Sequence, residues 1–261
     1  MTALIALPLL VLAVYYASVG LFAGLLFVIS ALALQEFYRM ALPSDRRLES
    51  ALSIVAGIAC SAGLVFAAGS QATLLSLVLP FLCLTLIYLF CFRDLQRVSR
   101  DLAVSLLGIL YIPVLLSHAV LLRELPAGRD WIFLVLFVVM ASDTLAYFIG
   151  MKLGRRRLYE AVSPKKSVEG ALGGLAGGIL GAAICRLWFF AELDLTDVVL
   201  IGLGVGAFSQ LGDLVESLLK RSFGVKDSGA MIPGHGGLLD RLDSLLFAFP
   251  LTYYYALWMF A

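Results

Sequence analysis

Charged residues are scarce in this sequence, and histidine and cysteine are scarcer still. Only 14% of its 261 residues are charged, against roughly 25% in soluble domains, while 62% are hydrophobic. A soluble fold is therefore not expected. The four cysteines lie in or beside apolar runs without metal-ligand or redox spacing, and there are only two histidines. Zinc, copper and thiol chemistry are accordingly not expected.

Apolar runs long enough to cross a bilayer recur along the whole chain. A crossing helix needs about 20 residues, and runs bounded by charges or turn formers predict about nine spans. These are residues 3–17, 19–35, 51–68, 72–91, 102–122, 131–151, 171–190, 196–220 and 244–260. No linker separates a soluble part. We therefore expect an all-α, polytopic transmembrane helix bundle that forms one integral membrane domain over residues 1–261.

Lysine and arginine are distributed unevenly between the connecting segments. Nearly all of the 19 fall in alternate loops, at residues 36–50, 92–101, 152–170 and 220–243. Positive residues stay on the cytoplasmic side of a membrane. The pattern therefore predicts a cytoplasmic amino terminus and an external carboxyl terminus.

Glycine is concentrated in two of the expected spans, at Gly173, Gly174, Gly177, Gly178 and Gly181, and at Gly202, Gly204 and Gly206. Small residues at such spacing let membrane helices approach closely. Neither a strand nor the flanking pattern of a dinucleotide fingerprint surrounds them. We expect these glycines to pack helices and not to bind a ligand.

A carboxylate inside an expected span costs about 2.5–3.5 kcal/mol on insertion scales, and two such residues stand out. Asp143 lies nine residues before Lys152, and Asp213 lies seven before Lys220, which places both roughly 10–14 Å from helix ends on the same side. Gln210, Asp213, Ser217 and Lys220 share one helical face, which must line a wet interior. Glu216 beside this face either pairs with a base or takes part in catalysis.

The segment after this span is dense in charge and glycine, between Lys226 and Asp243. Glycines on both sides of His235 permit positive φ and let backbone amides approach an anion closely. Carboxylate, hydroxyl and amide oxygens suit Mg²⁺, and nearby bases suit a polyphosphate. Together these residues predict phosphoryl or nucleotidyl transfer at the membrane surface.

Residues Ser217–Asp243 resemble the phosphatidate cytidylyltransferase (CDP-diacylglycerol synthase) motif at its defining positions. The similarity extends upstream to Gly212-Asp213-Leu214, to residues 163–170, and to residues 142–154 around Asp143. The first hundred residues match only as apolar scaffold spans with an exit similar to Glu36-Phe37-Tyr38. The active site is expected within residues 131–243.

The resemblance implies an enzyme that uses CTP and phosphatidic acid to make CDP-diacylglycerol and pyrophosphate, with Mg²⁺ as cofactor and a second cation left open. It implies metal ligands at Asp213 and Asp240, with Asp243 and Asp227 as weaker candidates. The catalytic residues that it implies are Asp213, Asp240, Lys226, Arg241 and His235. Those implied for substrate binding are Asp143, Lys165, Lys166, Ser217, Lys220, Arg221, Gly234, Gly236 and Gly237. His235 either contacts pyrophosphate or organises the glycine segment.

The expected partners are CTP, phosphatidic acid and the lipid bilayer, with no nucleic acid and with a homodimer left open. The expected location is a bacterial inner membrane, with the site facing the cytoplasm. A transporter is the rival class, but it would show paired repeats with interrupted helices in both halves. A CTP-dependent polyprenol or phytol kinase is the second enzyme alternative, and it would release CDP in place of pyrophosphate.

Overall fold

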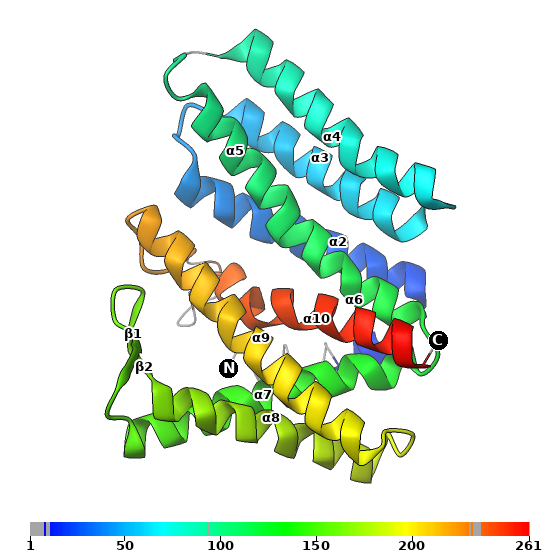
Figure 1. Cartoon of the computed structure of the whole chain (residues 1–261). Coiled ribbons are helices and arrows are strands. Elements are labelled where there is room, and N and C mark those ends of the chain that lie inside the picture. Colours follow the sequence, from blue (N-terminus) through cyan, green and yellow to red (C-terminus); the bar gives the residue numbers. More distant parts are fainter. Residues whose placement is uncertain (1–7, 9–10, 93, 230, 232–235, 261) are drawn as a thin grey trace. The chain divides into compact units, whose positions relative to one another are not determined.

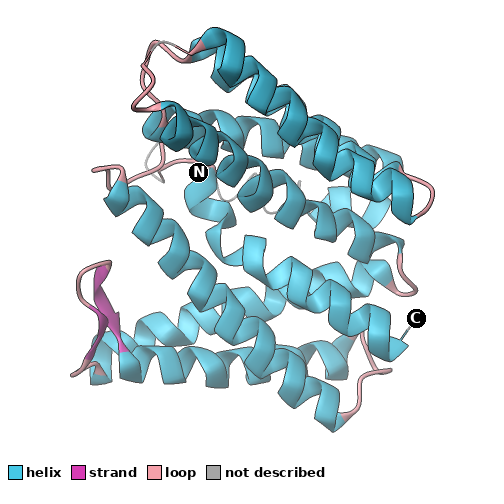
Figure 2. Ribbon diagram, turned by 45° about the horizontal axis from the view of Figure 1, so that its top comes forward, coloured by secondary structure: helices cyan, strands magenta, loops and turns pink. Residues whose placement is uncertain are grey.

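The computed structural model describes residues 8, 11–92, 94–229, 231 and 236–260, and this part of the chain is mostly helical (Figure 1). The helices are α2 (Val19–Ala41), α3 (Arg47–Phe66), α4 (Ser70–Cys91), α5 (Val98–Ile109), α6 (Leu115–Glu124), α7 (Gly128–Leu153), α8 (Val168–Trp188), α9 (Leu195–Ser222) and α10 (Leu239–Phe260). A π-helix, η1 (Leu110–Val114), connects α5 to α6. Two short strands, β1 (Arg157–Tyr159) and β2 (Ser163–Ser167), pair antiparallel between α7 and α8 (Figure 2).

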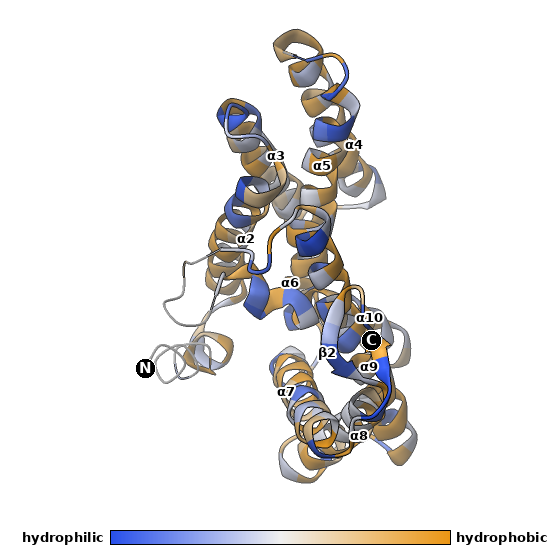
Figure 3. Ribbon diagram, turned by 90° about the vertical axis from the view of Figure 1, so that its left-hand side faces the viewer, coloured by the Kyte–Doolittle hydropathy of each residue, from blue (hydrophilic) through white to orange (hydrophobic). Residues whose placement is uncertain are grey.

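Seven helical segments of the described chain are long and apolar enough to cross a membrane. They are Val19–Ala41, Arg47–Phe66, Ser70–Cys91, Val98–Glu124, Gly128–Leu153, Val168–Trp188 and Leu195–Ser222. Each corresponds to one of the expected spans, and Figure 3 shows hydrophobic residues along most of the helical ribbon. The chain is therefore an integral membrane protein with several apolar helices.

Two expected spans are not among these seven segments. The first, 3–17, falls largely outside the described residues. The last, 244–260, lies within α10, which forms a continuous helix but contains Pro250 and three consecutive tyrosines that make it less apolar. The nine-span topology and its orientation remain predictions.

Polar caps fix where several of these helices begin. The Ser18 hydroxyl accepts a hydrogen bond from the Leu21 amide at the start of α2, and Ser167 caps α8 in the same way. Asp194 and Asp197 form a reciprocal capping box at the start of α9. Such caps satisfy amide groups that the first helical turn leaves without partners.

The chain divides into two compact units, and the single-domain organisation expected from the sequence stays a prediction. The first unit contains residues 17–120 and 227–240 with the described part of 1–9, and the second contains 10–16, 121–226 and the described part of 241–261. In the first unit, α2, α3, α4 and α5 pack around a core that includes Cys60, Leu84 and Ile109. The Tyr38 hydroxyl donates to the Ser105 carbonyl at 2.7 Å, joining α2 to α5.

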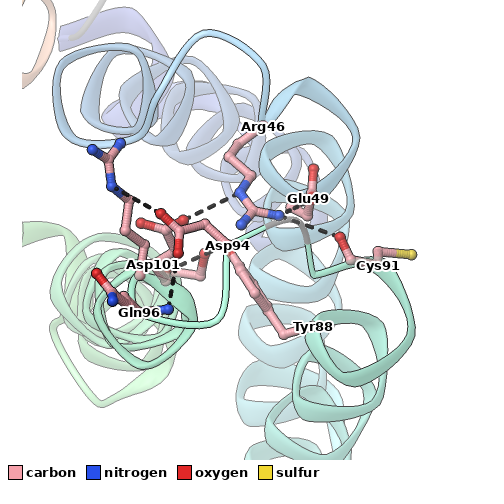
Figure 4. Close-up of polar contacts among 9 residues, drawn as sticks. Arg46, Glu49, Tyr88, Cys91, Asp94, Gln96 and Asp101 are labelled. Atoms are coloured by element: carbon pink, nitrogen blue, oxygen red, sulfur yellow. Dashed lines mark hydrogen bonds and ion pairs between the residues drawn. The ribbon is translucent and has the colours of Figure 1, made fainter.

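The first unit also contains a buried ion network, defined here as Arg46, Glu49 and Asp101 (Figure 4). The Arg46 guanidinium lies 2.7 Å from the Glu49 carboxylate and 3.1 Å from that of Asp101, and it also donates to the Cys91 carbonyl. Burial opposes its charge, but the hydrogen bond and charge of Glu49, with the charge of Asp101, raise the pKa of Arg46. The network connects the starts of α3 and α5 to the end of α4.

In the second unit, glycines set the distance between helices α7, α8 and α9, which pack together. A side chain at Gly178 of α8 would collide with the carbonyl oxygen of Gly202 in α9, and one at Gly202 would collide with the backbone of Ile179. Gly181 faces α7 with less crowding, since a Cβ atom there would lie 3.0 Å from Ala141 and 3.1 Å from the backbone of Val138. The expectation that these glycines serve close helix packing is confirmed.

Candidate active site

Three carboxylates of the second unit lie close enough for their charges to interact, and we call Asp143, Asp213 and Asp243 the carboxylate cluster. They belong to α7, α9 and α10 respectively. The charges of Asp213 and Asp143 act on the Asp243 carboxyl, and the charge of Asp213 acts on the Asp143 carboxyl. Like charges at such range repel one another, so the cluster requires positive charge beside it.

A glycine next to Asp213 allows the close approach of α9 and α10. Gly212 is buried, and a Cβ atom there would collide with the backbone carbonyl of Asp243 and press against Phe247. Any larger residue would push the two helices apart. Gly212 therefore helps to bring Asp213 and Asp243 into one cluster.

Lysines supply positive charge at the cluster. The Lys166 ammonium lies 2.6 Å from the Asp213 carboxylate, and the Ser217 hydroxyl donates to the other oxygen of Asp213 at 3.4 Å. Lys220 forms an ion pair with the fully buried Glu216 and also contributes its charge at Asp243. Of the two roles left open for Glu216, the structure shows the pairing with a base.

A hairpin places Lys166 next to Asp213. Strand β2 carries both Lys165 and Lys166, and of these Lys165 is exposed whereas Lys166 is partly buried. The chain before β1 is held by Glu169, whose carboxylate accepts hydrogen bonds from the amides of Arg155 and Arg156 at 3.0 and 3.2 Å. The hairpin is thus fixed to the start of α8 and presents its lysines from a defined position.

In the first unit, Asp240 organises the segment 227–240 through backbone amides. Its carboxylate accepts hydrogen bonds from the amide of Gly237 at 2.7 Å and from that of Ser228 at 3.1 Å. Gly236 has φ of 83°, the left-handed conformation that glycine adopts most easily. This agrees with the expectation that glycine at this position permits a positive φ.

Glu36 is the partner of this segment that sequence reasoning missed. It is 3% exposed on α2, and its carboxylate accepts hydrogen bonds from the Leu239 amide at 2.9 Å and from the Ser228 hydroxyl at 3.4 Å. Side chains at Gly229 or Gly237 would collide with it. The expected span ended at residue 35, so the cost of a carboxylate in an apolar span, which drew attention to Asp143, did not point to Glu36. Helix α2 continues to Ala41, and with that helix end the same rule would have found it.

Comparison with known protein families covers nearly the whole chain. A sequence profile described as the Cytidylyltransferase family matches residues 1–259. The chain belongs to the cytidylyltransferase family.

Relatives with similar sequences are named phosphatidate cytidylyltransferase. The protein from Bacillus subtilis (strain 168) is 42% identical over 149 residues, which is 57% of this chain and 55% of the relative. The protein from Synechocystis sp. is 40% identical over 195 residues, covering 63% and 65% of the two chains. One from Staphylococcus epidermidis (strain RP62A) is 37% identical over 151 residues, covering 58% and 57%. The chain thus matches between about half and two thirds of the length of these relatives.

The remaining expected site residues of this family member are distributed between the two units. In the second unit, Lys226, Arg221 and Arg241 are exposed. Asp227, in the first unit, is exposed as well. Gly234 and His235 lie outside the described residues, so both interpretations of His235 stay open. The shared cation expected between Asp213 and Asp240 remains a prediction.

The donors of the carboxylate cluster fit Mg²⁺ by their chemistry. Carboxylate and hydroxyl oxygens are the ligands that Mg²⁺ prefers, and this ion is usually held by one or two carboxylates together with substrate phosphates. Among the residues that the structure describes, no three His, Cys, Asp or Glu side chains converge as a metal-binding group. Since Mg²⁺ takes its other ligands from water and phosphate, two carboxylates are enough. The Lys166 ammonium beside Asp213 shows that the position suits a cation.

Proposed function

We propose that this chain transfers the cytidylyl group of CTP to phosphatidic acid, giving CDP-diacylglycerol and pyrophosphate in phospholipid synthesis. The observation that carries the proposal is the family match over residues 1–259, with relatives named phosphatidate cytidylyltransferase at about 40% identity. The motif from Ser217 to Asp243 supports the same activity. Charge-dense residues beside apolar helices suit one water-soluble substrate and one lipid substrate.

In the proposed reaction, an oxygen of phosphatidic acid attacks the α-phosphorus of CTP, and the bond from that phosphorus to the pyrophosphate oxygen breaks. A phosphate monoester has its second pKa near 6, so the nucleophile is largely ionised at neutral pH. A strong general base is therefore not needed. Catalysis requires alignment of the two phosphates and neutralisation of their charge.

Two groups of residues would supply these requirements. Asp213 and Asp243 would hold Mg²⁺, with Asp143 beside it. Asp240 and Asp227 stay proposed ligands, as the resemblance implies. Mg²⁺ held there would neutralise charge on the substrate phosphates. Lys166 and Lys220 already lie at these carboxylates, and they would turn to substrate phosphates. We also assign phosphate contacts to the exposed bases Lys165, Arg221, Lys226 and Arg241.

We further propose nine spans with a cytoplasmic amino terminus, a bacterial inner membrane as the location and a site that faces the cytoplasm; a homodimer stays open. The alternation of basic loops and the bacterial relatives support this arrangement. Single cysteines placed in segments 36–50 and 152–170 of a cysteine-free variant should react only from the cytoplasm, and one in 191–196 only from outside. Labelling of 152–170 from outside would refute the orientation.

The activity is tested with purified protein, CTP, phosphatidic acid and Mg²⁺, by measuring pyrophosphate and the lipid product together. We expect equal amounts of pyrophosphate and CDP-lipid. Release of CDP with a phosphorylated lipid would identify a kinase and refute the proposal. If the folded protein converted CTP equally well when no lipid was present, the proposal would be refuted as well.

A further inference from the structure

A cavity of about 550 Å³ in the first unit lies where α2 ends and α3 begins. This is within the range of about 300–1,000 Å³ that small-molecule sites occupy. Its lining combines arginines with apolar side chains and includes Arg39, Arg46, Arg47, Leu42, Ala51 and Ile54. We call it the arginine pocket. It shares no residue with the carboxylate cluster.

The charge of the arginine pocket comes from two of its three arginines. Arg46 is buried and neutralised by Glu49 and Asp101 in the ion network. Arg39 and Arg47 are exposed, and neither is in an ion pair with any residue that the structure describes. Among the described residues that line the pocket, none is acidic. It therefore offers two guanidinium groups to an anion, and guanidinium binds phosphate through paired hydrogen bonds.

An apolar stripe continues from the arginine pocket along α3. Leu48, Ala51 and Val55 are spaced by three and four residues, so they share one helical face. Leu48 is 57% exposed and Val55 65% exposed, and Ala51 also lines the pocket. The apolar stripe would contribute nothing to the binding of a soluble anion. A ligand with a phosphate and a hydrocarbon chain would use both features.

The position of the pocket matches such a ligand. It lies at the polar ends of two apolar helices, α2 and α3, which are both candidate membrane spans. Basic pockets between membrane helices bind lipid headgroups. We propose that the arginine pocket binds the phosphate headgroup of an anionic phospholipid, with an acyl chain along Leu48, Ala51 and Val55.

The test measures binding without CTP, so it does not depend on the proposed enzymatic activity. Purified protein in neutral detergent is titrated with dioleoyl-phosphatidylglycerol, and bound lipid is counted by native mass spectrometry. This lipid is neither substrate nor product of the proposed reaction. The variant Arg39→Gln/Arg47→Gln is compared with Arg97→Gln/Arg100→Gln, which removes the same charge from exposed positions of the same unit outside the pocket.

We expect each single pocket variant to weaken binding roughly fivefold and the double variant roughly thirtyfold, the effect of one and two basic groups near a lipid headgroup. The Arg97/Arg100 control should bind as the wild type does. Ala51→Phe, which fills the pocket without changing charge, should weaken binding too. Dioleoyl-phosphatidylcholine should bind at least tenfold more weakly.

Three results would overturn the proposal. Equal loss in the two double variants would show general surface attraction. Full competition by glycerol 3-phosphate at the concentration of the lipid would show a site for a soluble phosphate ester. Unchanged binding in both Ala51→Phe and the pocket double variant would place the lipid elsewhere.

Discussion

Replacing Asp213 with Asn tests whether the carboxylate cluster is catalytic or structural. Asn has nearly the shape of Asp and keeps an oxygen that can accept from the Ser217 hydroxyl. The change removes one negative charge and with it the ion pair to Lys166 at 2.6 Å. It also removes repulsion between position 213 and the carboxylates of Asp143 and Asp243.

The expected effect on stability is small. The side chains of Lys166 and Asp213 are 27% and 32% exposed, and an ion pair that solvent reaches contributes about 0–1 kcal/mol. Relief of repulsion acts in the opposite direction. We therefore expect the free energy of unfolding to change by less than about 1 kcal/mol in either direction. A thousandfold loss of kcat, by contrast, corresponds to about 4 kcal/mol of transition-state stabilisation.

The two quantities are measured on the same preparation. CDP-lipid formation at saturating CTP and Mg²⁺ gives kcat, and thermal unfolding in detergent gives stability. Asp94→Asn is the matched control, because Asp94 forms an exposed ion pair with Arg97 at 3.4 Å outside the cluster. We expect a loss of about a thousandfold for Asp213→Asn and none for the control. Near-wild-type kcat, or inactivity that accompanies unfolding, would refute the assignment.

Four further outcomes are expected. Arg46→Met leaves two buried carboxylates without their cation, so thermal unfolding should show that the free energy of unfolding falls by about 3–5 kcal/mol. Neutralising all three members of the ion network should restore most of that free energy. Glu36→Ala leaves a buried amide of the 227–240 segment without its acceptor and should cost about 1–3 kcal/mol, with faster proteolysis of that segment than in Glu36→Gln. Gly178→Ala places a methyl group against a facing carbonyl and should cost at least about 1–3 kcal/mol, whereas Gly24→Ala, where nothing lies within 4 Å, should be neutral in the same unfolding assay. Lys166→Ala should raise the KM for CTP more than the KM for phosphatidic acid, and equal changes in steady-state assays would indicate a structural role.

The apolar helices could be predicted from the sequence because bilayer thickness imposes a length on each one. Seven candidate spans in the described part of the chain have ends within six residues of those expected. Where α10 begins was harder to predict. It starts at Leu239, five residues before the expected 244, because Glu36 accepts the Leu239 amide from a distant part of the chain. A contact between residues so far apart cannot be predicted from a pattern of neighbouring residues.

The candidate site was predictable where a local rule applied. Asp143 and Asp213 were found by the cost of a charge at membrane depth, and the structure places Asp243 with them. Their catalytic role remains a prediction. The role of Asp240 as an acceptor for backbone amides was not predictable, because it depends on where the fold places the amides of Ser228 and Gly237.

The hydrogen bond between the Glu36 carboxylate and the Leu239 amide also affects when the protein can fold during its synthesis. The two residues are 203 positions apart, so the ribosome completes α2 long before the amide that pairs with its carboxylate exists. During that interval the Glu36 side chain must have water or another protein as its partner. The first unit therefore cannot reach its final form during insertion of its own helices, and truncation before residue 239 should yield a polypeptide that cellular quality control removes.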